Sequence, residues 1–577
     1  MQDEDLEEKL NKRERYKARL RPYEYFAEFE TLDFENLGEG DRYYLQDFGI
    51  FTTDFLEDEF TLRLRVPAGR LSAEQFSFIG DVATKYNLHI ILTARAGVQL
   101  HGIEAHNILE IFKQINTLGL TSWQSFGDNI RNIVTDVYDG RGQYSEIETY
   151  PIIMQMQEFI LKNPRYVGML PRRVSIALSG NRANVSSFFA NDIYFALAQK
   201  DENFGFNVYM GGKNSEVAQN ADIFLLPHAV FDFFKAFVET FYLFGPRTSR
   251  AKIRLFDMIE SVGMNALKEL IQTQYANKLE SSGLLLLEKK EFAQSEILKN
   301  GTYAFCYHTD FARVNADEIQ QISEYATKYK AEIRIGIDQN IYLLGLQESE
   351  TPFASPKQSA TILACAGNLC PYSFWSIKNE TIYLPLELIA KHRIQVGFSG
   401  CAKGCARHHH TDIGLIGLKT NNFGDTEGGA RVFIGAEHSN GASVGRMLFS
   451  MVPLVHLHAL LTRIITIYEQ SGYKDFEEFS IHVLNRYSTG FLGMWLLANL
   501  QTNQSLKLQA NETENLNEQE QFAYEKKLLQ QFFPELEFLD LIDENFFKAT
   551  SALSKKLWTV EGKDPNYKPP MKRVAVR

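Results

Sequence analysis

The stretch RLSAEQFSFIGDVATKYNLHIILTARAGVQLHGI (residues 70–103) has a second copy further along the chain. RVNADEIQQISEYATKYKAEIRIGIDQNIYLLGL (313–346) aligns with it without a gap at an offset of 243 positions, and both contain ATKY. Each copy opens with a helix-capping pattern, Ser72 with Gln75 and Asn315 with Glu318, followed by apolar residues at helical spacing and then a strand. The sequence therefore predicts a duplicated α+β half-domain.

A weaker repeat follows each copy. RRVSIALSGNRANVSSFFANDI (172–193) aligns with HRIQVGFSGCAKGCARHHHTDI (392–413) at an offset of 220 positions, and both run from an apolar strand into SG and end on DI. Cysteines occur only in the second copy. The chain is thus predicted to be ordered as half-domain, lobe, half-domain, lobe.

The copies of the half-domain differ in their polar residues. The first carries Arg95, Gln99 and His101, where the second has aspartate, tyrosine and leucine at the equivalent positions. The scaffold residues match while this polar set occurs once. We therefore expect a site built on one side of a pseudo-twofold axis.

Bulk composition limits the class of protein. The chain has 577 residues, 45% of them hydrophobic, with a formal charge of −12, so several domains and a water-soluble surface are expected. The negative charge disfavours nucleic acid and anionic membranes as partners, and any anion site must be a local gathering of cations. The N-terminal residues are charged, with no apolar segment typical of a signal peptide, and a cytoplasmic location is expected.

Four of the five cysteines lie within 41 residues, as Cys365-x4-Cys370 and Cys401-x3-Cys405. Four thiolates can hold either a structural zinc ion or an iron–sulfur cluster, and the small, apolar setting favours the cluster. A disulfide redox pair is less consistent with this spacing. The three histidines His408–His410 are expected to form a turn at a solvent or cofactor edge rather than to bind metal.

Arginines gather in the first half of the chain. In FTLRLRVPAG (60–69), strand alternation would place Arg63 and Arg65 on one face, where two guanidinium groups would share an anion. Arg131, Arg172 and Arg173 follow in GDNIRNIVTD and MLPRRVSIAL. Because arginine binds carboxylates and stays charged, the set indicates a polyanionic cofactor or substrate.

At this point the sequence resembles the sulfite and nitrite reductases that contain siroheme and a [4Fe-4S] cluster. LRLRVPAG, LTARAGVQLHGI, RNIV, LPRR, CAGNLC and SGCAKGCARHHHTDIGLIG occur in that family's order over roughly residues 55–420. The resemblance implies an α+β fold in which two ferredoxin-like half-domains pair about a pseudo-twofold axis, with two α/β lobes that bind siroheme and cluster. The implied parts are an N-terminal extension (1–50), half-domain 1 (51–118), lobe 1 (119–295), half-domain 2 (296–352), and lobe 2 with a C-terminal arm (353–577).

The resemblance also implies roles for individual residues. The four clustered cysteines would ligate the [4Fe-4S] cluster, and Cys405 would also be the axial ligand of the siroheme iron. Cations on the substrate side of that iron would be Arg63, Arg131 and Arg173. Contacts to the macrocycle would come from Arg65, Arg95, Gln99, His101 and Arg407.

Several positions depart from the family pattern. The loop between Cys365 and Cys370 is one residue shorter than usual, which makes Cys370 the least secure ligand. Arg173 stands where the family usually has a lysine, and an arginine does not readily give up a proton. Ser175 stands where the sulfite branch typically has a second lysine. Lys403 stands where asparagine is common, and we expect it to supply a titratable cation near the cofactor.

The implied activity is the six-electron reduction of sulfite to sulfide or of nitrite to ammonia. His101 favours sulfite and Ser175 favours nitrite, with sulfite preferred. No nucleotide-binding motif is evident, so electrons should come from a separate ferredoxin or flavoprotein. Two alternatives stay open, a precorrin-3B synthase-like oxygenase of cobalamin synthesis, and a zinc-stabilised scaffold that binds an anionic partner.

Overall fold

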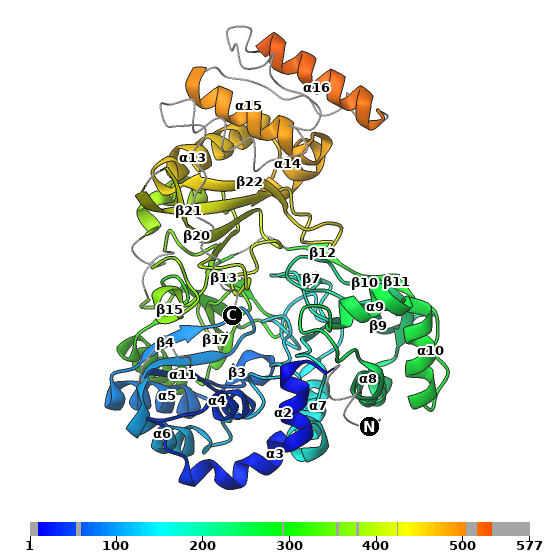
Figure 1. Ribbon diagram of the computed structural model, residues 1–577, viewed down its shortest axis with the longest axis vertical. Coiled ribbons are helices and arrows are strands. Elements are labelled where there is room, and N and C mark those ends of the chain that lie inside the picture. Colours follow the sequence, from blue (N-terminus) through cyan, green and yellow to red (C-terminus); the bar gives the residue numbers. More distant parts are fainter. Residues whose placement is uncertain are drawn as a thin grey trace. The chain divides into compact units, whose positions relative to one another are not determined.

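The protein is described by a computed structural model that covers residues 10–52, 59–290, 293–353, 357–376, 380–423, 425–502 and 516–532 (Figure 1). It forms two compact units. Unit 1 comprises Met1–Lys357 with Ser439–Gly441, and unit 2 comprises Gln358–His438 with Ala442–Arg577. The predicted C-terminal arm lies outside the described residues, and the predicted domain boundaries stay predictions.

The two half-domains of unit 1 each build an antiparallel sheet that needs a strand from the other half. The first sheet has the order β1-β2-β5-β4-β15 and the second β13-β14-β17-β16-β3. Strand β3 from the first copy pairs with β16, and β15 from the second copy pairs with β4. The strands are β1 Ile50–Phe51, β2 Glu59–Arg63, β3 Arg70–Leu71, β4 His89–Leu92, β5 Val98–Glu104, β13 Ser295–Ile297, β14 Tyr303–Tyr307, β15 Arg313–Val314, β16 Glu332–Ile335 and β17 Ile341–Leu346.

The duplicated helices, α5 (Ala73–Tyr86) and α11 (Ala316–Tyr329), pack against each other. Both capping boxes predicted from the sequence are formed. Ser77 Oγ donates to Gln320 Oε1 at 2.6 Å, and these two residues are equivalent positions 243 apart. Equivalent residues touch where a pseudo-twofold axis passes between the copies, so the predicted duplication and its symmetry are confirmed.

The lobe of unit 1 carries a mixed sheet of order β10-β9-β8-β11, with β6 parallel to β8. Helix α8 contributes the largest share of a separate apolar core, which includes Phe233, Phe237 and Phe241. A short parallel pair, β7 with β12, lies outside the main sheet. The elements are β6 Ile176–Ser179, β7 Ala183–Asn184, β8 Ile193–Lys200, β9 Asn203–Met210, β10 Gln219–Leu225, β11 Leu284–Leu285, β12 Glu288–Lys289, α7 Tyr150–Lys162, α8 Val230–Phe244, α9 Leu255–Val262 and α10 Met264–Gln274. Helix α6 (Ile108–Ile115) belongs to the first half-domain, whose apolar core it joins.

Unit 2 repeats the lobe's design in a sheet of order β18-β19-β20-β21-β22. Strands β19 and β20 pair in parallel as β6 and β8 do. Each residue pair of β19 and β20 corresponds to a pair of β6 and β8 that lies 220 positions earlier in the chain. The Asp of each DI motif accepts the equivalent backbone N–H, Ser175 to Asp192 and Gln395 to Asp412, both at 2.8 Å. The second repeat is therefore structural. The elements are β18 Ile362–Ala364, β19 Val396–Ser399, β20 Ile413–Phe423, β21 Asp425–Ile434, β22 Arg446–Pro453, α12 Leu386–Lys391, α13 Leu454–Ser471, α14 Phe476–His482, α15 Thr489–Thr502 and α16 Glu518–Phe532.

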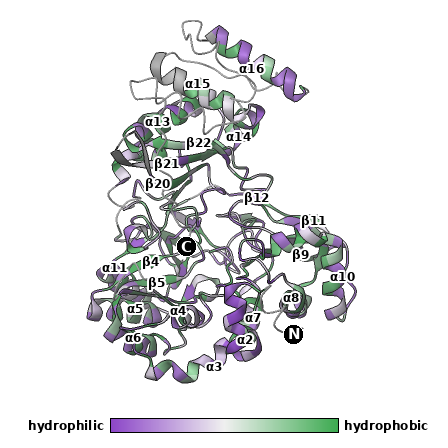
Figure 2. Ribbon diagram, viewed as in Figure 1, coloured by the Kyte–Doolittle hydropathy of each residue, from purple (hydrophilic) through white to green (hydrophobic). Residues whose placement is uncertain are grey.

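The N-terminal segment of unit 1 adds α2 (Lys12–Arg19), α3 (Pro22–Tyr25) and α4 (Glu39–Leu45). Tyr25, Tyr43 and Tyr44 join the same apolar core as the half-domains. Helix α2, by contrast, is strongly hydrophilic, as its purple colour in Figure 2 shows. None of the described helices combines the length and apolar character needed to cross a bilayer.

Candidate cluster and anion sites

The four clustered cysteines of unit 2 follow two neighbouring parallel strands. Cys365 comes directly after β18 and Cys370 ends a 3₁₀ turn (Gly367–Leu369). Cys401 and Cys405 lie in the turn after β19. Parallel strands end at the same edge of a sheet, and Cys365 N donates to Phe398 O of β19 at 3.2 Å. The two cysteine pairs, distant in sequence, are thereby brought to one edge.

The thiol groups lie close enough to influence one another. Burial and then the nearby Cys405 sulfur raise the pKa of the Cys365 thiol to about 12. Burial raises the pKa of Cys370 to about 11, with further increases from Cys405 and Cys401. Four thiolates in this setting need a positive centre to stay ionised, and the iron of a cluster would supply it.

The donors around Cys365 fit a bound iron–sulfur cluster. Its Sγ accepts N–H groups from Gly367 at 3.3 Å and Gly400 at 3.2 Å, and such hydrogen bonds to sulfur tune a cluster's potential. Within the described residues, no group of three or more histidine, cysteine, aspartate or glutamate side chains converges on one metal ion. In a cubane each cysteine binds a different iron, so its four ligands need not share one point.

Two glycines shape the cysteine turns. A Cβ on Gly400 would lie 1.8 Å from Ser373 Oγ and 3.3 Å from Cys365 Sγ, so only glycine fits there. Gly404 has φ +73°, in the left-handed region. The shortened loop before Cys370 is accommodated by the 3₁₀ turn, which places its thiol within electrostatic reach of Cys401 and Cys405. Ligation by Cys370 stays a prediction.

Lys403 and the three histidines surround this turn. The ammonium of Lys403 lies over the ring of Tyr372, 2.8 Å from its centroid, and the Lys403 side chain is exposed. His408 Nδ1 contacts Ser399 Oγ at 2.9 Å and His409 Nδ1 contacts Gly445 O at 3.2 Å. His408 and His410 are buried, so the turn is confirmed and these two do not lie at a solvent edge, whereas a place at a cofactor edge stays a prediction.

In unit 1, four of the predicted arginines form one cationic group. Burial, and then the charges of Arg173, Arg63 and Arg95, lower the pKa of Arg131 well below its usual value. Arg131 Nη1 donates to Ser125 O at 2.6 Å, and Arg95 Nη1 donates to Asn191 Oδ1 at 3.3 Å. Like charges gathered in this way favour an anion among them.

Arg63 is held in place by two neighbours. It pairs with Gln99 across β2 and β5. With the amide turned to satisfy both groups, Gln99 Oε1 accepts from Arg63 Nη2 at 2.6 Å and from Nε at 3.0 Å. The guanidinium also lies over the ring of Phe126, 3.8 Å from its centroid. Gln99 thus positions an arginine, a role that was not predicted, and its predicted contact with a macrocycle stays untested.

Arg65 does not share an anion with Arg63, contrary to the expectation from strand alternation. Strand β2 ends at Arg63, and Arg65 instead pairs with Thr121. All five N–H groups of its buried guanidinium are taken by Gln157 Oε1 and by carbonyl oxygens of Gln124, Ile130 and Arg131. Burial lowers its pKa to about 9. This geometry supports a structural role for Arg65 and leaves no donor for a macrocycle.

The remaining predicted residues have the following places. His101 is buried on β5 with Nδ1 3.0 Å from Thr61 Oγ1. Ser175 Oγ donates to buried Asp192 at 2.6 Å, which fixes it inside the fold. In unit 2, Arg407 adopts a left-handed φ of 54°, and burial lowers its pKa to about 10.

Sequence reasoning missed Phe126 and Asn191, which contact Arg63 and Arg95. Neither contact can be predicted from residue spacing, because each joins segments that are far apart in the chain. The proximity of Phe126 to the GDNIR motif was the one local hint.

Two known protein families match the chain, each over two segments. Residues 126–279 and 387–478 match the nitrite and sulphite reductase 4Fe-4S domain, and residues 56–118 and 297–353 match the nitrite/sulfite reductase ferredoxin-like half domain. The segment with Cys365 and Cys370 lies outside these matches.

Individual relatives agree. The ferredoxin–nitrite reductase of Synechococcus elongatus is 26% identical over 494 residues, covering 79% of this chain and 96% of its own. The chloroplastic ferredoxin–nitrite reductase of Spinacia oleracea is 26% identical over 442 residues, covering 70% and 74%. The solved structure of the Mycobacterium tuberculosis NirA protein has the same fold, with a TM-score of 0.74 at 22% identity, covering 82% of this chain and 96% of that one. The chain belongs to the nitrite and sulphite reductase family and is an oxidoreductase of that type.

Proposed function

We propose that this chain reduces nitrite to ammonia with six electrons from a ferredoxin, using siroheme and a [4Fe-4S] cluster. The observation that carries the proposal is the group of four arginines in unit 1, which suits a small oxyanion. The printed names of the relatives, ferredoxin–nitrite reductases, support nitrite and ferredoxin over sulfite and a flavoprotein.

The cysteines of unit 2 would hold the electron-transfer group. Cys365, Cys370, Cys401 and Cys405 are proposed to hold the [4Fe-4S] cluster, and Cys405 would also hold the siroheme iron. Cys405 is the exposed member of the set, as a ligand shared with a second group requires. When bound, cluster and siroheme supply single electrons and a metal that accepts the substrate's nitrogen.

The arginines of unit 1 would bind and orient the anion. Arg63 is fixed by Gln99 and Phe126, and Arg131 by the carbonyl of Ser125. Preorganised guanidinium groups stabilise negative charge that develops on the departing oxygens. Arg95 and His101, with Arg407 in unit 2, are proposed to contact the carboxylates and edges of the macrocycle.

Proton delivery needs a different group, because a guanidinium does not readily give up a proton. Arg173 is therefore proposed to bind the anion and not to protonate it. Lys403, an exposed ammonium beside the cysteine turn, is the proposed titratable cation. Lys403→Met should alter the pH profile of turnover, and an unchanged profile would remove Lys403 from the mechanism.

Sulfite remains the second candidate substrate, because His101 occupies a position that resembles the sulfite branch. In the structure His101 is held against Thr61, so its ring is fixed. The relatives' names outweigh this single residue, and we place nitrite first.

Anaerobic purification followed by absorption spectra, iron and zinc counts, and assays with reduced ferredoxin tests the proposal. We expect a coloured protein with iron, ammonia from nitrite and slower sulfide from sulfite. Cys370→Ser should lose cluster iron, whereas Cys306→Ala, at a buried cysteine on β14, should keep it. A colourless zinc protein would support the scaffold alternative, and oxygen-dependent hydroxylation of a tetrapyrrole would support the precorrin alternative.

A further inference from the structure

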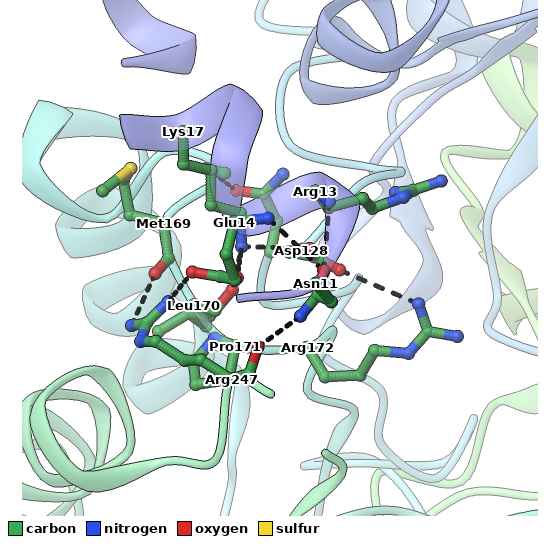
Figure 3. Close-up of polar contacts among 12 residues, drawn as sticks. Asn11, Arg13, Glu14, Lys17, Asp128, Met169, Leu170, Pro171, Arg172 and Arg247 are labelled. Atoms are coloured by element: carbon green, nitrogen blue, oxygen red, sulfur yellow. Dashed lines mark hydrogen bonds and ion pairs between the residues drawn. The ribbon is translucent and has the colours of Figure 1, made fainter. Parts of the chain in front are cut away.

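Helix α2 of the N-terminal segment buries charges where an ordinary surface helix would expose them. Its sequence is KRERYKAR, and Glu14 and Lys17 are its buried residues. Lys17 Nζ lies 2.6 Å from Glu14 Oε1, 3.1 Å from Asp128 Oδ2 and 2.7 Å from Leu170 O (Figure 3). A buried ammonium is tolerated because each of its three donors has an acceptor. The helix is thus attached to the fold by specific polar contacts.

Asp128 is the acceptor at the centre of this arrangement. Its fully buried carboxylate accepts two hydrogen bonds from Arg250, at 2.6 and 2.8 Å, and lies 3.9 Å from Arg172 Nη1. Burial alone would raise the pKa of Asp128, but Lys17 and Arg250 lower it well below its usual value. The carboxylate is therefore ionised and tied to three cations.

The same contacts hold the backbone that leads into Arg172 and Arg173. Three successive carbonyls, those of Met169, Leu170 and Pro171, accept from Arg247 at 3.1 Å, Lys17 at 2.7 Å and Arg250 at 3.4 Å.

Arg247 is in turn tied to α2 (Figure 3). Its Nη1 donates to Glu14 Oε2 at 2.5 Å, and its carbonyl accepts from Asn11 Nδ2 at 2.6 Å. Helix α2 therefore contacts the Arg173 segment both directly and through Arg247.

The segment that carries Arg131 is also connected to Asp128 and to the segment that carries Arg173. Asp128 lies three residues before Arg131, whose backbone N–H donates to Val174 O at 2.7 Å. Val174 N donates back to Asn129 O at 3.1 Å, and Ile130 pairs with Val174 in parallel. Lys17 thus bridges the starts of the two segments, 128–131 and 169–173, that present Arg131 and Arg173.

We propose that Lys17 is a positioning residue for anion binding. Through Asp128 and the Leu170 carbonyl it keeps the two segments in register, so that Arg131 and Arg173 can bind one anion together. The inference rests on the proposed function, since it takes these arginines to be substrate cations.

Lys17→Met tests this, with Lys12→Met as the matched control. Lys12 lies on the same helix, and its ion pair with Glu39 is exposed. Displacing binding groups by about 1 Å can cost up to about a hundredfold, so we expect Lys17→Met to raise the KM for nitrite on the order of tenfold with kcat nearly unchanged. Hydrogen exchange, read by mass spectrometry, should become faster over 128–131 and 169–173, and Lys12→Met should match the wild type.

A KM within twofold of the wild type, or unchanged exchange in both segments, would overturn the inference. A general loss of folded protein would instead lower the apparent kcat and leave KM in place. If Lys17→Met does not fold, Glu14→Gln removes the charge that faces both Lys17 and Arg247 at constant shape, and the same two readouts decide. If the wild type does not reduce nitrite, calorimetric titration with nitrite and with sulfite replaces KM, so the two proposals fail separately.

Discussion

Asp47, a buried acid next to Asp128, should give unit 1 a pH-dependent stability. Its Oδ1 accepts from Asn129 Nδ2 at 2.6 Å, and among the described residues its Oδ2 has no hydrogen-bond partner. Burial and then the charge of Asp128 raise its pKa from 3.8 to about 7. Asp47→Asn keeps the shape and removes the ionisation.

The magnitude follows from proton binding. Between pH 5 and pH 7 the folded protein largely keeps a proton on Asp47 that the unfolded chain has lost, so the free energy of unfolding falls as pH rises. The fall is at most about 1.4 kcal/mol per pH unit and about 2.3 kcal/mol in all. Above the folded pKa the loss levels off within about one pH unit. The Asn variant lacks this loss, so relative to the wild type it should gain about 2–3 kcal/mol between pH 5 and pH 8.

Urea unfolding at pH 5 and pH 8 measures the gain. Because the chain has two compact units, pulse-labelled hydrogen exchange read on peptides of unit 1 keeps the other unit out of the signal. Asp33→Asn is the control: Asp33 is exposed and its hydrogen bond with Asn36 lowers its pKa, so it does not titrate in this range. Equal pH dependence in the wild type and Asp47→Asn would refute the reasoning.

Three further changes have defined outcomes. Gly400→Ala places a methyl group on Ser373 and should abolish cluster assembly, measured as iron per chain, while a full iron count would show that the turn can move. Phe126→Leu removes the ring under Arg63 and should raise the KM for nitrite about threefold to tenfold, with an unchanged KM excluding the contact from binding. Thiol titration of native apoprotein should find that the exposed Cys405 reacts first and that the buried Cys306 reacts only in urea; reaction of Cys306 in the native protein would contradict its burial.

The fold could be predicted because both repeats carry local signals. Capping boxes at Ser72 and Asn315 and apolar spacing fix the helices, and the SG and DI motifs mark equivalent turns of the two lobes. The exchange of β3 and β15 between the sheets left no such signal, since a two-residue strand pairs through its backbone and any sequence can supply that.

The candidate site was predictable in its residue types and less so in its geometry. Cysteine spacing indicated a shared role for the four thiols, and both pairs come to one sheet edge because parallel strands end together. Alternation misplaced Arg65, since β2 ends two residues earlier and the guanidinium turns to backbone carbonyls. The roles of Lys17 and Phe126 depend on contacts between distant segments, which periodicity does not report.

The reciprocal strand exchange also determines when the first sheet can be completed during synthesis. The first sheet cannot be completed until Arg313 of β15 has left the ribosome, although Ile91 of β4, with which Arg313 pairs, emerged long before. At ~5–20 residues per second the delay is about 10–45 s. During that interval the open edge of β4 is available for mispairing, so we expect the nascent chain to need a holding chaperone until the second repeat arrives.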